Sequence, residues 1–327
     1  MRGRFPALTL SVFFLAQSAS SYAEQSKTLP RIGMLNASSA ASLKSRMADF
    51  HKGLREVGYV EGKNIAIEYR YADGQLSRLP ELAADLVRLN VAMIIAGGGQ
   101  SIRAAKDATK TIPIVMTQVV DPLEFVSNLA KPDGNITGLS AQQAELGGKR
   151  LELLKESVPK LSLVAVIGTR STLDGPEMQE IKAAARTVRL QLQPVEIPRS
   201  AGPHDLAQAF LAISKTRAGA VMGLSAPEFS VHRVKLADLA IKQRLPSIYR
   251  DSEFPIAGGL MSYGAHYPDL YRRTAIYVDK ILKGAKPGDL PIEQPVKFEF
   301  IINLKTAKQI GLTIPPNVLA RADKVIR

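Results

Sequence analysis

Short apolar runs alternate with longer amphipathic segments along most of this chain, and that alternation restricts its fold more than any other feature. The apolar runs have the length of strands, while the segments between them carry apolar residues at helical spacing, as Met47, Phe50 and Leu54 do. Strands that alternate with helices form a parallel sheet covered by helices on both faces. We expect strands in the first half at residues 31–35, 65–71, 91–96, 114–116 and 136–139.

The same alternation starts again after Ser140. Two Rossmann-like lobes with parallel sheets are therefore predicted, which is typical of a protein that binds its ligand in a cleft between lobes. A short helix is also expected over residues 123–130 and one continuous helix over residues 229–244. The strands expected in the second half are residues 163–167, 191–197, 218–224, 246–249, 258–262 and 296–302.

The N-terminus has the pattern of a secretory signal peptide over residues 1–23. Arg2 and Arg4 supply positive charge, an apolar run follows from Leu8 to Ala16, and Ser21-Tyr22-Ala23 fits the small-x-small cleavage rule. A short membrane anchor is the alternative, but the run is shorter than the roughly 20 residues that span a bilayer. We therefore predict cleavage after Ala23 and a periplasmic protein.

Composition and motifs exclude several functional classes. The net charge is +13, yet the lysines and arginines are scattered, so we expect a basic solvated surface and no nucleic-acid partner. The chain has no cysteine, and its four histidines lack the spacing of a zinc site, so no metal is expected. No phosphate-binding loop is present, and Gly223-Leu224-Ser225 lacks the second glycine of a hydrolase nucleophile elbow. We expect no cofactor and no enzymatic activity, with Ser225 as a loop residue of the cleft.

Asp121 is the strongest single candidate for ligand binding. It follows the apolar run that starts at Ile114, and Pro122 then breaks the strand. An acid at the carboxyl end of a parallel strand lies where open α/β sheets bind ligands, and a carboxylate pairs with an ammonium group. The same Asp-Pro pair also suits a helix cap. Both interpretations remain open, and they are compatible.

The glycine-rich turn from Gly97 to Ser101 is the second candidate. It follows a predicted strand and opens a helix, so its backbone N–H groups can hold an anion such as a carboxylate. A tight strand-to-helix turn without a ligand is the alternative. In this turn the predicted ligand-binding residues are Gly98, Gly99, Gln100 and Ser101.

Other candidates follow or end predicted strands. Tyr249 and Tyr263 offer flat faces to an apolar or aromatic ligand, although both also suit a core or hinge position. The remaining predicted ligand-binding residues are polar: Ser38, Ser39, Thr117, Thr169, Ser171, Ser225 and Asp251.

Several longer stretches resemble exported substrate-binding proteins of ABC transporters, in the branch named for tryptophan and tyrosine transport. The most telling are GLREVGYVEGKNIAIEYR from Gly53, LAKPDGNITGLS from Leu129, VDKILKGAKP from Val278 and INLKTAKQIGLTIP from Ile302. Val120 stands where this family usually has glycine, and Gly99 where it usually has a hydroxyl residue.

This resemblance implies the type I periplasmic binding fold, in which three crossovers join the lobes. By analogy, lobe 1 takes residues 30–140 and 255–292, and lobe 2 takes residues 141–254 and 293–327. The implied function is the capture of an amino acid or similar small organic acid and its delivery, as a monomer, to an ABC permease. The alternatives are a secreted α/β enzyme and a binding protein that serves a sensor.

Overall fold

The computed structural model describes residues 29–132, 134–141 and 143–327. The predicted signal peptide lies outside these residues. No helix in the described part of the chain is long and apolar enough to cross a membrane.

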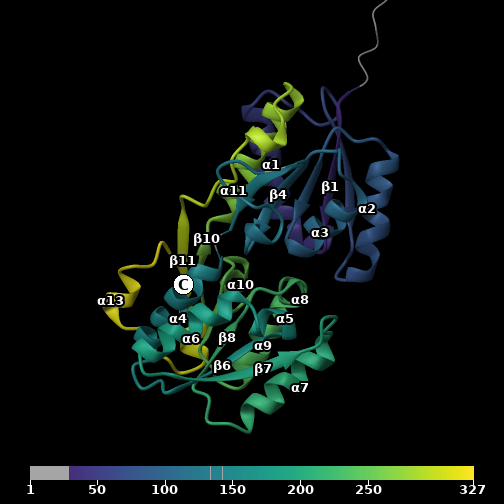
Figure 1. Cartoon of the computed structure of the whole chain (residues 1–327). Helices are drawn as coiled ribbons and strands as arrows, with labels where there is room; N and C mark the ends of the chain where they lie inside the picture. The colour runs from purple at the N-terminus through teal and green to yellow at the C-terminus, as the bar shows by residue number, and fades with distance from the viewer. Residues whose placement is uncertain (1–28, 133, 142) are drawn as a thin grey trace, which may run out of the picture.

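The first lobe contains a five-stranded parallel sheet in the order β2-β1-β3-β4-β5 (Figure 1). Strand β1, second in this order, pairs through Gly33 with Glu68 of β2 on one side and Ile94 of β3 on the other. The strands are β1 (Arg31–Asn36), β2 (Ala66–Tyr71), β3 (Ile94–Gly97), β4 (Ile114–Val119) and β5 (Ile136–Ser140). The helices are α1 (Ala40–Glu56), α2 (Leu79–Arg88), α3 (Gly99–Ala108) and α11 (Tyr267–Leu282), with 3-10 turns η1 (Leu76–Arg78), η2 (Pro122–Glu124) and η3 (Pro287–Asp289).

The second lobe contains a seven-stranded sheet in the order β12-β11-β10-β9-β8-β6-β7, in which only β10 and β11 are antiparallel neighbours. The strands are β6 (Leu163–Thr169), β7 (Gln191–Ile197), β8 (Ala220–Gly223), β9 (Ser247–Tyr249), β10 (Met261–Ala265), β11 (Phe298–Asn303) and β12 (Lys324–Ile326). The longer helices are α4 (Gln143–Ser157), α6 (Pro176–Thr187), α7 (Pro203–Ser214) and α9 (Arg233–Lys242). The shorter ones are α5 (Arg170–Leu173), α8 (Pro227–Val231), α10 (Glu253–Ile256), α12 (Leu304–Gln309) and α13 (Pro316–Leu319).

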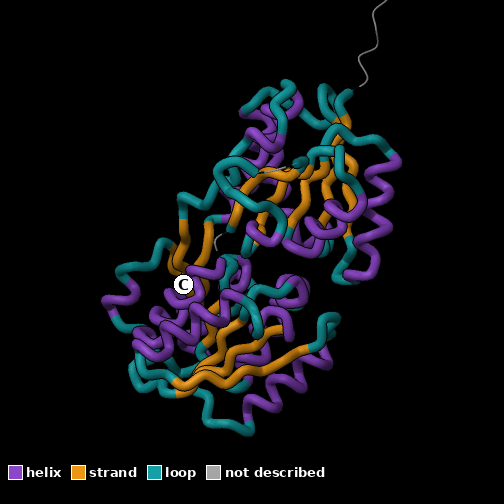
Figure 2. The backbone as a smooth tube through the Cα atoms, in the orientation of Figure 1, coloured by secondary structure: helices purple, strands orange, loops and turns teal. Residues whose placement is uncertain are grey.

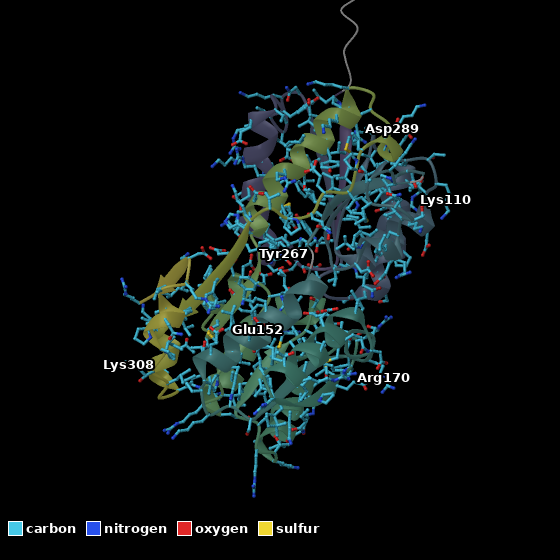
Figure 3. All side chains as sticks on the ribbon, turned by 60° about the vertical axis from the view of Figure 1, so that its left-hand side comes forward. Lys110, Glu152, Arg170, Tyr267, Asp289 and Lys308 are labelled. Atoms are coloured by element: carbon cyan, nitrogen blue, oxygen red, sulfur yellow. The ribbon has the colours of Figure 1, made fainter. Side chains whose placement is uncertain are left out.

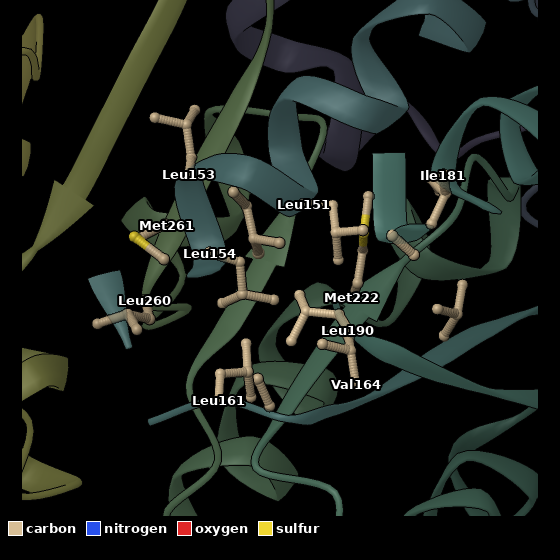
Figure 4. Packing of buried hydrophobic residues seen from close by; sticks show 14 of the residues in the cluster. Leu151, Leu153, Leu154, Leu161, Val164, Ile181, Leu190, Met222, Leu260 and Met261 are labelled. Carbon is tan, nitrogen blue, oxygen red and sulfur yellow. The ribbon is translucent and has the colours of Figure 1, made fainter. Parts of the chain in front are cut away.

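Helices cover both faces of each sheet, as Figure 2 shows for the whole chain. In the first lobe α1 and α11 bury their apolar stripes on one face, and α2 and α3 cover the other. In the second lobe α4 and α6 form one core with the sheet (Figure 4), and α7 and α9 form the other. Because both faces are covered, strands such as β4 are buried at every residue. The predicted fold class is confirmed.

The chain passes between the lobes at three adjacent segments of the described structure. The segment after β5 lies beside the segment before β11, because the Ser140 N–H donates to the Glu293 carbonyl at 2.9 Å. The segment after β10 joins them through the His266 N–H, which donates to the Lys297 carbonyl at 2.9 Å. These contacts place all three crossovers at one side of the molecule, where a hinge can form.

Three sequence-based expectations about these elements need correction. Residues 255–265 do not belong to the first lobe, because β10 pairs with β9 and β11 of the second sheet. The helix expected over residues 123–130 shrinks to η2, since the Asn128 side chain accepts the N–H groups of Ala130 and Lys131 in place of a helical carbonyl. The helix expected over residues 229–244 is split into α8 and α9 at His232.

Candidate ligand-binding cleft

A cavity of about 500 Å³ lies between the lobes, at the carboxyl ends of strands from both sheets. Residues that follow β1, β3 and β4 line it on one side, and residues that follow β6, β7, β8 and β9 line it on the other. Such a cleft is where open α/β sheets bind ligands. The structure brings these predicted ligand-binding residues into its wall: Ser38, Gly98, Gly99, Gln100, Asp121, Thr169, Ser171 and Ser225.

The N-terminus of α3 forms part of the first-lobe wall. Gly98 precedes the helix with a positive φ of 80°, and its N–H donates to the Thr117 carbonyl at 2.9 Å. A side chain on Gly97 would clash, because its Cβ would lie 2.1 Å from Nδ2 of Asn36. The glycines thus let the backbone turn directly from β3 into the helix. The first N–H groups of α3 have no helical acceptor, so this end of the cavity favours an anion.

Asp121 also lies in the first-lobe wall, two residues after the end of β4 and immediately before η2. Its Oδ1 atom accepts the N–H of Leu123 at 2.9 Å, which is the helix-cap arrangement. The cap interpretation is therefore present in the structure. The cap uses the Oδ1 atom of Asp121, and the side chain still lines the cavity.

Three predicted residues on or near the first lobe's strands lie outside the cavity wall. The Ser39 hydroxyl caps α1 by accepting the Ser42 N–H at 3.2 Å. Ser101 and Thr117 are fully buried. Thr117 was expected to follow the strand over 114–116, but β4 extends to Val119 and contains it. Both Ser101 and Thr117 face the interior of the lobe, and the sequence spacing alone does not determine this direction.

Tyr249 and Tyr263, predicted to contact the ligand, do not line this cavity. Tyr249 is 1% exposed and stacks on Phe254 with ring centroids 4.1 Å apart. Its ring fills the space over Gly223, where a Cβ would lie 2.6 Å from it. Tyr263 instead lies beside Phe298, with ring centroids 6.4 Å apart. Both rings are used in the packing of the second lobe.

Asp251 serves a contact between the lobes and does not line the cavity. It forms a buried ion pair with Arg46 of α1, a cavity residue that is only 5% exposed. Burial alone would raise the pKa of Asp251, but the charges of Arg46 and Arg250 outweigh it and hold that pKa below its usual range. The guanidinium of Arg46 also lies 4.5 Å from the ring centroid of Tyr267, which Figure 3 labels where the lobes meet.

Arg46 also holds the side chain of Gln118 in place. Neither residue was among the predicted ligand-binding residues. Nη1 of Arg46 donates to the Gln118 Oε1 at 2.7 Å, and the Gln118 amide also bonds the Tyr271 hydroxyl. Gln118 has a positive φ of 61°, at the register shift where β4 passes β5. A non-glycine residue in that conformation is held by its surroundings. No sequence motif marks either residue, since Arg46 lies in mid-helix and Gln118 inside an apolar run.

The second-lobe wall rests on another buried ion pair, between Arg150 of α4 and Glu177 of α6. Glu177 lines the cavity, and its Oε2 accepts the backbone N–H of Ser225 at 3.0 Å. This contact fixes the loop after β8. Glu228, in the short helix α8 that follows this loop, also lines the cavity. Burial raises its pKa to about 7 even though the charge of Arg199 opposes that shift.

Arg250 lines the cavity and directly follows β9. It was not among the predicted ligand-binding residues, although it lies one position before the predicted Asp251. No ion pair joins Arg250 to any residue that the structure describes, in contrast to Arg46. Its positive charge lies close enough to lower the pKa of Asp251. The second lobe therefore offers a guanidinium to an anionic ligand.

Phe125 is the only aromatic residue among the described residues of the cavity wall. It lies in the first lobe, with the guanidinium of Arg103 at 5.4 Å from its ring centroid. Val119 and Val120 add apolar surface on the same side. The rest of the wall is mainly polar or charged, so it suits a ligand with charged ends and a short apolar portion.

Known proteins match this chain over most of its length. A family model described as ABC transporter substrate binding protein matches residues 31–326. A Tyrosine-binding protein of Clostridioides difficile (strain R20291) is 27% identical over 293 residues, which cover 88% of this chain and 82% of that protein.

Solved structures share the fold over most of the chain. A conserved domain protein from Vibrio cholerae has a TM-score of 0.83 and 26% identity, covering 91% of this chain and 100% of that one. An ABC domain from Streptococcus pneumonia, solved in complex with L-Trp, has a TM-score of 0.82 and 24% identity, with the same coverage of 91% and 100%.

Proposed function

The chain belongs to the family of ABC transporter substrate-binding proteins, and from that premise we propose that it captures an amino acid between its lobes. The family is one of binding proteins, so the prediction that the chain is not an enzyme is confirmed. The observation that carries the proposal is a single cavity that offers both an anion site and an acid, contributed by both lobes. An amino acid carries the two complementary charges.

The ligand carboxylate is assigned to the N-terminus of α3 and to Arg250. The helix offers unpaired N–H donors with the positive end of its dipole, and Arg250 offers a guanidinium without an ion-pair partner among the described residues. Because these groups belong to opposite lobes, a carboxylate that contacts both favours closure of the cleft.

The ligand ammonium is assigned to Asp121. The oxygen not used to cap η2 remains available for a charge-assisted hydrogen bond. Phe125, Val119 and Val120 then cover the apolar part of the ligand from the first lobe, in the role first given to Tyr249. Aromatic amino acids are the first ligands to test, since the relatives described above are named for tyrosine or contain L-Trp.

The finer steps of the function follow from family membership and the N-terminal pattern. We propose that residues 1–23 direct export and are removed, and that the mature monomer delivers its ligand to an ABC permease from the periplasm. Mass spectrometry of the periplasmic protein tests the first step, with an N-terminus at Glu24 expected and a retained Met1 contradicting it.

A thermal-shift screen of amino acids, small organic acids and aromatic compounds tests the ligand class, because a ligand that binds the native state raises the unfolding temperature. Asp121→Asn tests the ammonium site, since asparagine preserves the cap and removes the charge. We expect binding of the selected amino acid to weaken by roughly 30-fold or more, because an unpaired buried charge costs about 2–5 kcal/mol.

Asp107→Ala is the matched control, because this exposed acid lies in α3 but not in the cavity wall. It should bind like the unaltered protein. Stabilisation by simple carboxylic acids alone, with Asp121→Asn binding equally well or tighter, would reject the amino acid as the ligand.

A further inference from the structure

Glu228 is a buried acid at the cavity whose carboxylate is only partly satisfied. Glu228 is 6% exposed and lines the cavity, yet its Oε2 atom makes no hydrogen bond with any residue that the structure describes. The nearby Ser225 hydroxyl also lines the cavity and likewise has no hydrogen-bond partner among the described residues. Buried acceptors without donors are unfavourable, so their retention in a cavity wall points to a donor supplied by the ligand.

None of the described residues forms an ion pair with Glu228. Arg199 is the one positive group that acts on its pKa, and no ion pair between the two is formed in the described structure. The neighbouring acid Glu177 is different, because its carboxylate is taken by Arg150 and by the Ser225 N–H. Glu177 therefore positions the loop, whereas Glu228 remains available.

The sheet topology places this pair beside the proposed carboxylate site. Ser225 follows β8 and Arg250 follows β9, and these strands are neighbours in the second sheet. Neighbouring strands lie about 4.8 Å apart. A ligand whose carboxylate contacts Arg250 therefore has the Ser225–Glu228 pair within the length of an amino acid side chain.

We propose that Glu228 and Ser225 form a distal subsite that requires a hydrogen-bond donor at the far end of the ligand side chain. This proposal rests on the proposed amino acid function and narrows it to amino acids such as those with a phenol hydroxyl, an amide NH₂ or an ammonium group. A buried polar site discriminates strongly against an analogue that lacks the matching donor, because its own acceptors are then left unpaired.

Titration calorimetry with pairs of ligands of similar shape tests the subsite. The pairs are L-tyrosine with L-phenylalanine, L-glutamine with L-methionine, and L-lysine with L-norleucine. We expect the unaltered protein to prefer the donor-bearing member of the pair that it binds best by about 30-fold or more. Glu228→Leu should reduce that ratio to within about threefold, mainly by weakening the donor-bearing ligand.

Two more conservative substitutions keep the test valid if the Glu228→Leu variant misfolds. Glu228→Gln retains an acceptor oxygen and should give an intermediate ratio, while Ser225→Ala should lower the ratio less than Glu228→Leu does. Asp107→Ala should leave the ratio unchanged. Circular dichroism and the unfolding temperature of each variant confirm that the compared proteins are folded.

The outcomes separate this subsite from the function on which it rests. If no amino acid binds the unaltered protein, both proposals fail. If an amino acid binds but both members of each pair bind alike, or if the ratio survives in folded Glu228→Leu and Glu228→Gln, the distal subsite is wrong and the amino acid function stands.

Discussion

At the scale of single residues, the buried acids in and beside the cleft differ in what they contact. Asp251 is paired with Arg46 and Glu177 with Arg150, whereas Glu228 has one oxygen without a partner among the described residues. The pKa values of Asp251 and Glu228 shift in opposite directions for this reason. The pKa of Asp251 is held low by positive neighbours, and that of Glu228 is raised to about 7 by burial.

Glu228 therefore makes the ligand-free protein less stable as the pH rises. Its folded pKa of about 7 exceeds the ordinary value of 4.5, so the contribution to stability is fully present below about pH 4.5 and is lost as the pH rises through 7. We expect the stability of Glu228→Gln relative to the unaltered protein to be higher at pH 8 than at pH 5, by on the order of 3 kcal/mol. Urea unfolding at the two pH values measures it, and an equal difference at both would contradict it.

The sequence could predict residues near strand ends, but not the direction of their side chains. Gly98, Asp121 and Thr169 reach the cavity wall because they follow or end strands of parallel sheets. Tyr249 also ends a strand, yet its ring turns into the core, because Gly223 on the neighbouring strand leaves room for it. Arg46 was missed because it comes from the middle of a helix.

At the scale of elements, the turn from β3 into α3 decides whether the helix N-terminus faces the cleft. Gly98 has a positive φ of 80°, and no atom lies within 4 Å of the position of an added Cβ. A substitution there strains the backbone without a steric clash. The sequence predicted this strand-to-helix turn, whereas it predicted a helix after Asp121 that the structure lacks, because Asn128 forms competing local hydrogen bonds.

Gly98→Ala should destabilise the protein by about 1–2 kcal/mol and also weaken ligand binding, because relief of the strain displaces the first N–H groups of α3. Gly62→Ala is the matched control. Gly62 has a φ of 78° and equally open surroundings, but lies outside the cavity wall. Thermal unfolding and calorimetry should show similar losses of stability and a loss of affinity only in Gly98→Ala. Equal affinities would show that α3 does not contact the ligand.

At the scale of the whole molecule, the Arg46–Asp251 pair joins the lobes beside the crossovers. Both groups are buried, and Nε of Arg46 also lies 3.4 Å from Oε1 of Glu253. Removal of Asp251 therefore leaves the buried Arg46 charge with the weaker of its two carboxylate partners. Two lobes in one chain followed from the repeated alternation, but the sequence did not reveal this pair, whose members lie 205 residues apart.

Asp251→Asn should lower the stability by about 3 kcal/mol, the low end for a broken buried pair because Glu253 still contacts Arg46. It should also increase the radius of gyration of the ligand-free protein, since the lobes lose a contact. Small-angle scattering and thermal unfolding measure the two effects. Asp174→Asn is the control, because Asp174 forms an exposed ion pair with Arg170 within the second lobe. An Asp251→Asn variant as stable and as closed as this control would refute a role for the pair in holding the lobes together.

The central claim is that the cleft recognises both charges of an amino acid. Titration of the unaltered protein with the amino acid that the thermal screen selects, and with its amine and acid analogues, tests it most directly. For tyrosine the analogues are tyramine and 3-(4-hydroxyphenyl)propionate. We predict that the amino acid binds at least about 30-fold more tightly than either analogue, because each leaves one charged site of the cleft unpaired. An acid analogue that binds as tightly as the amino acid would contradict the account.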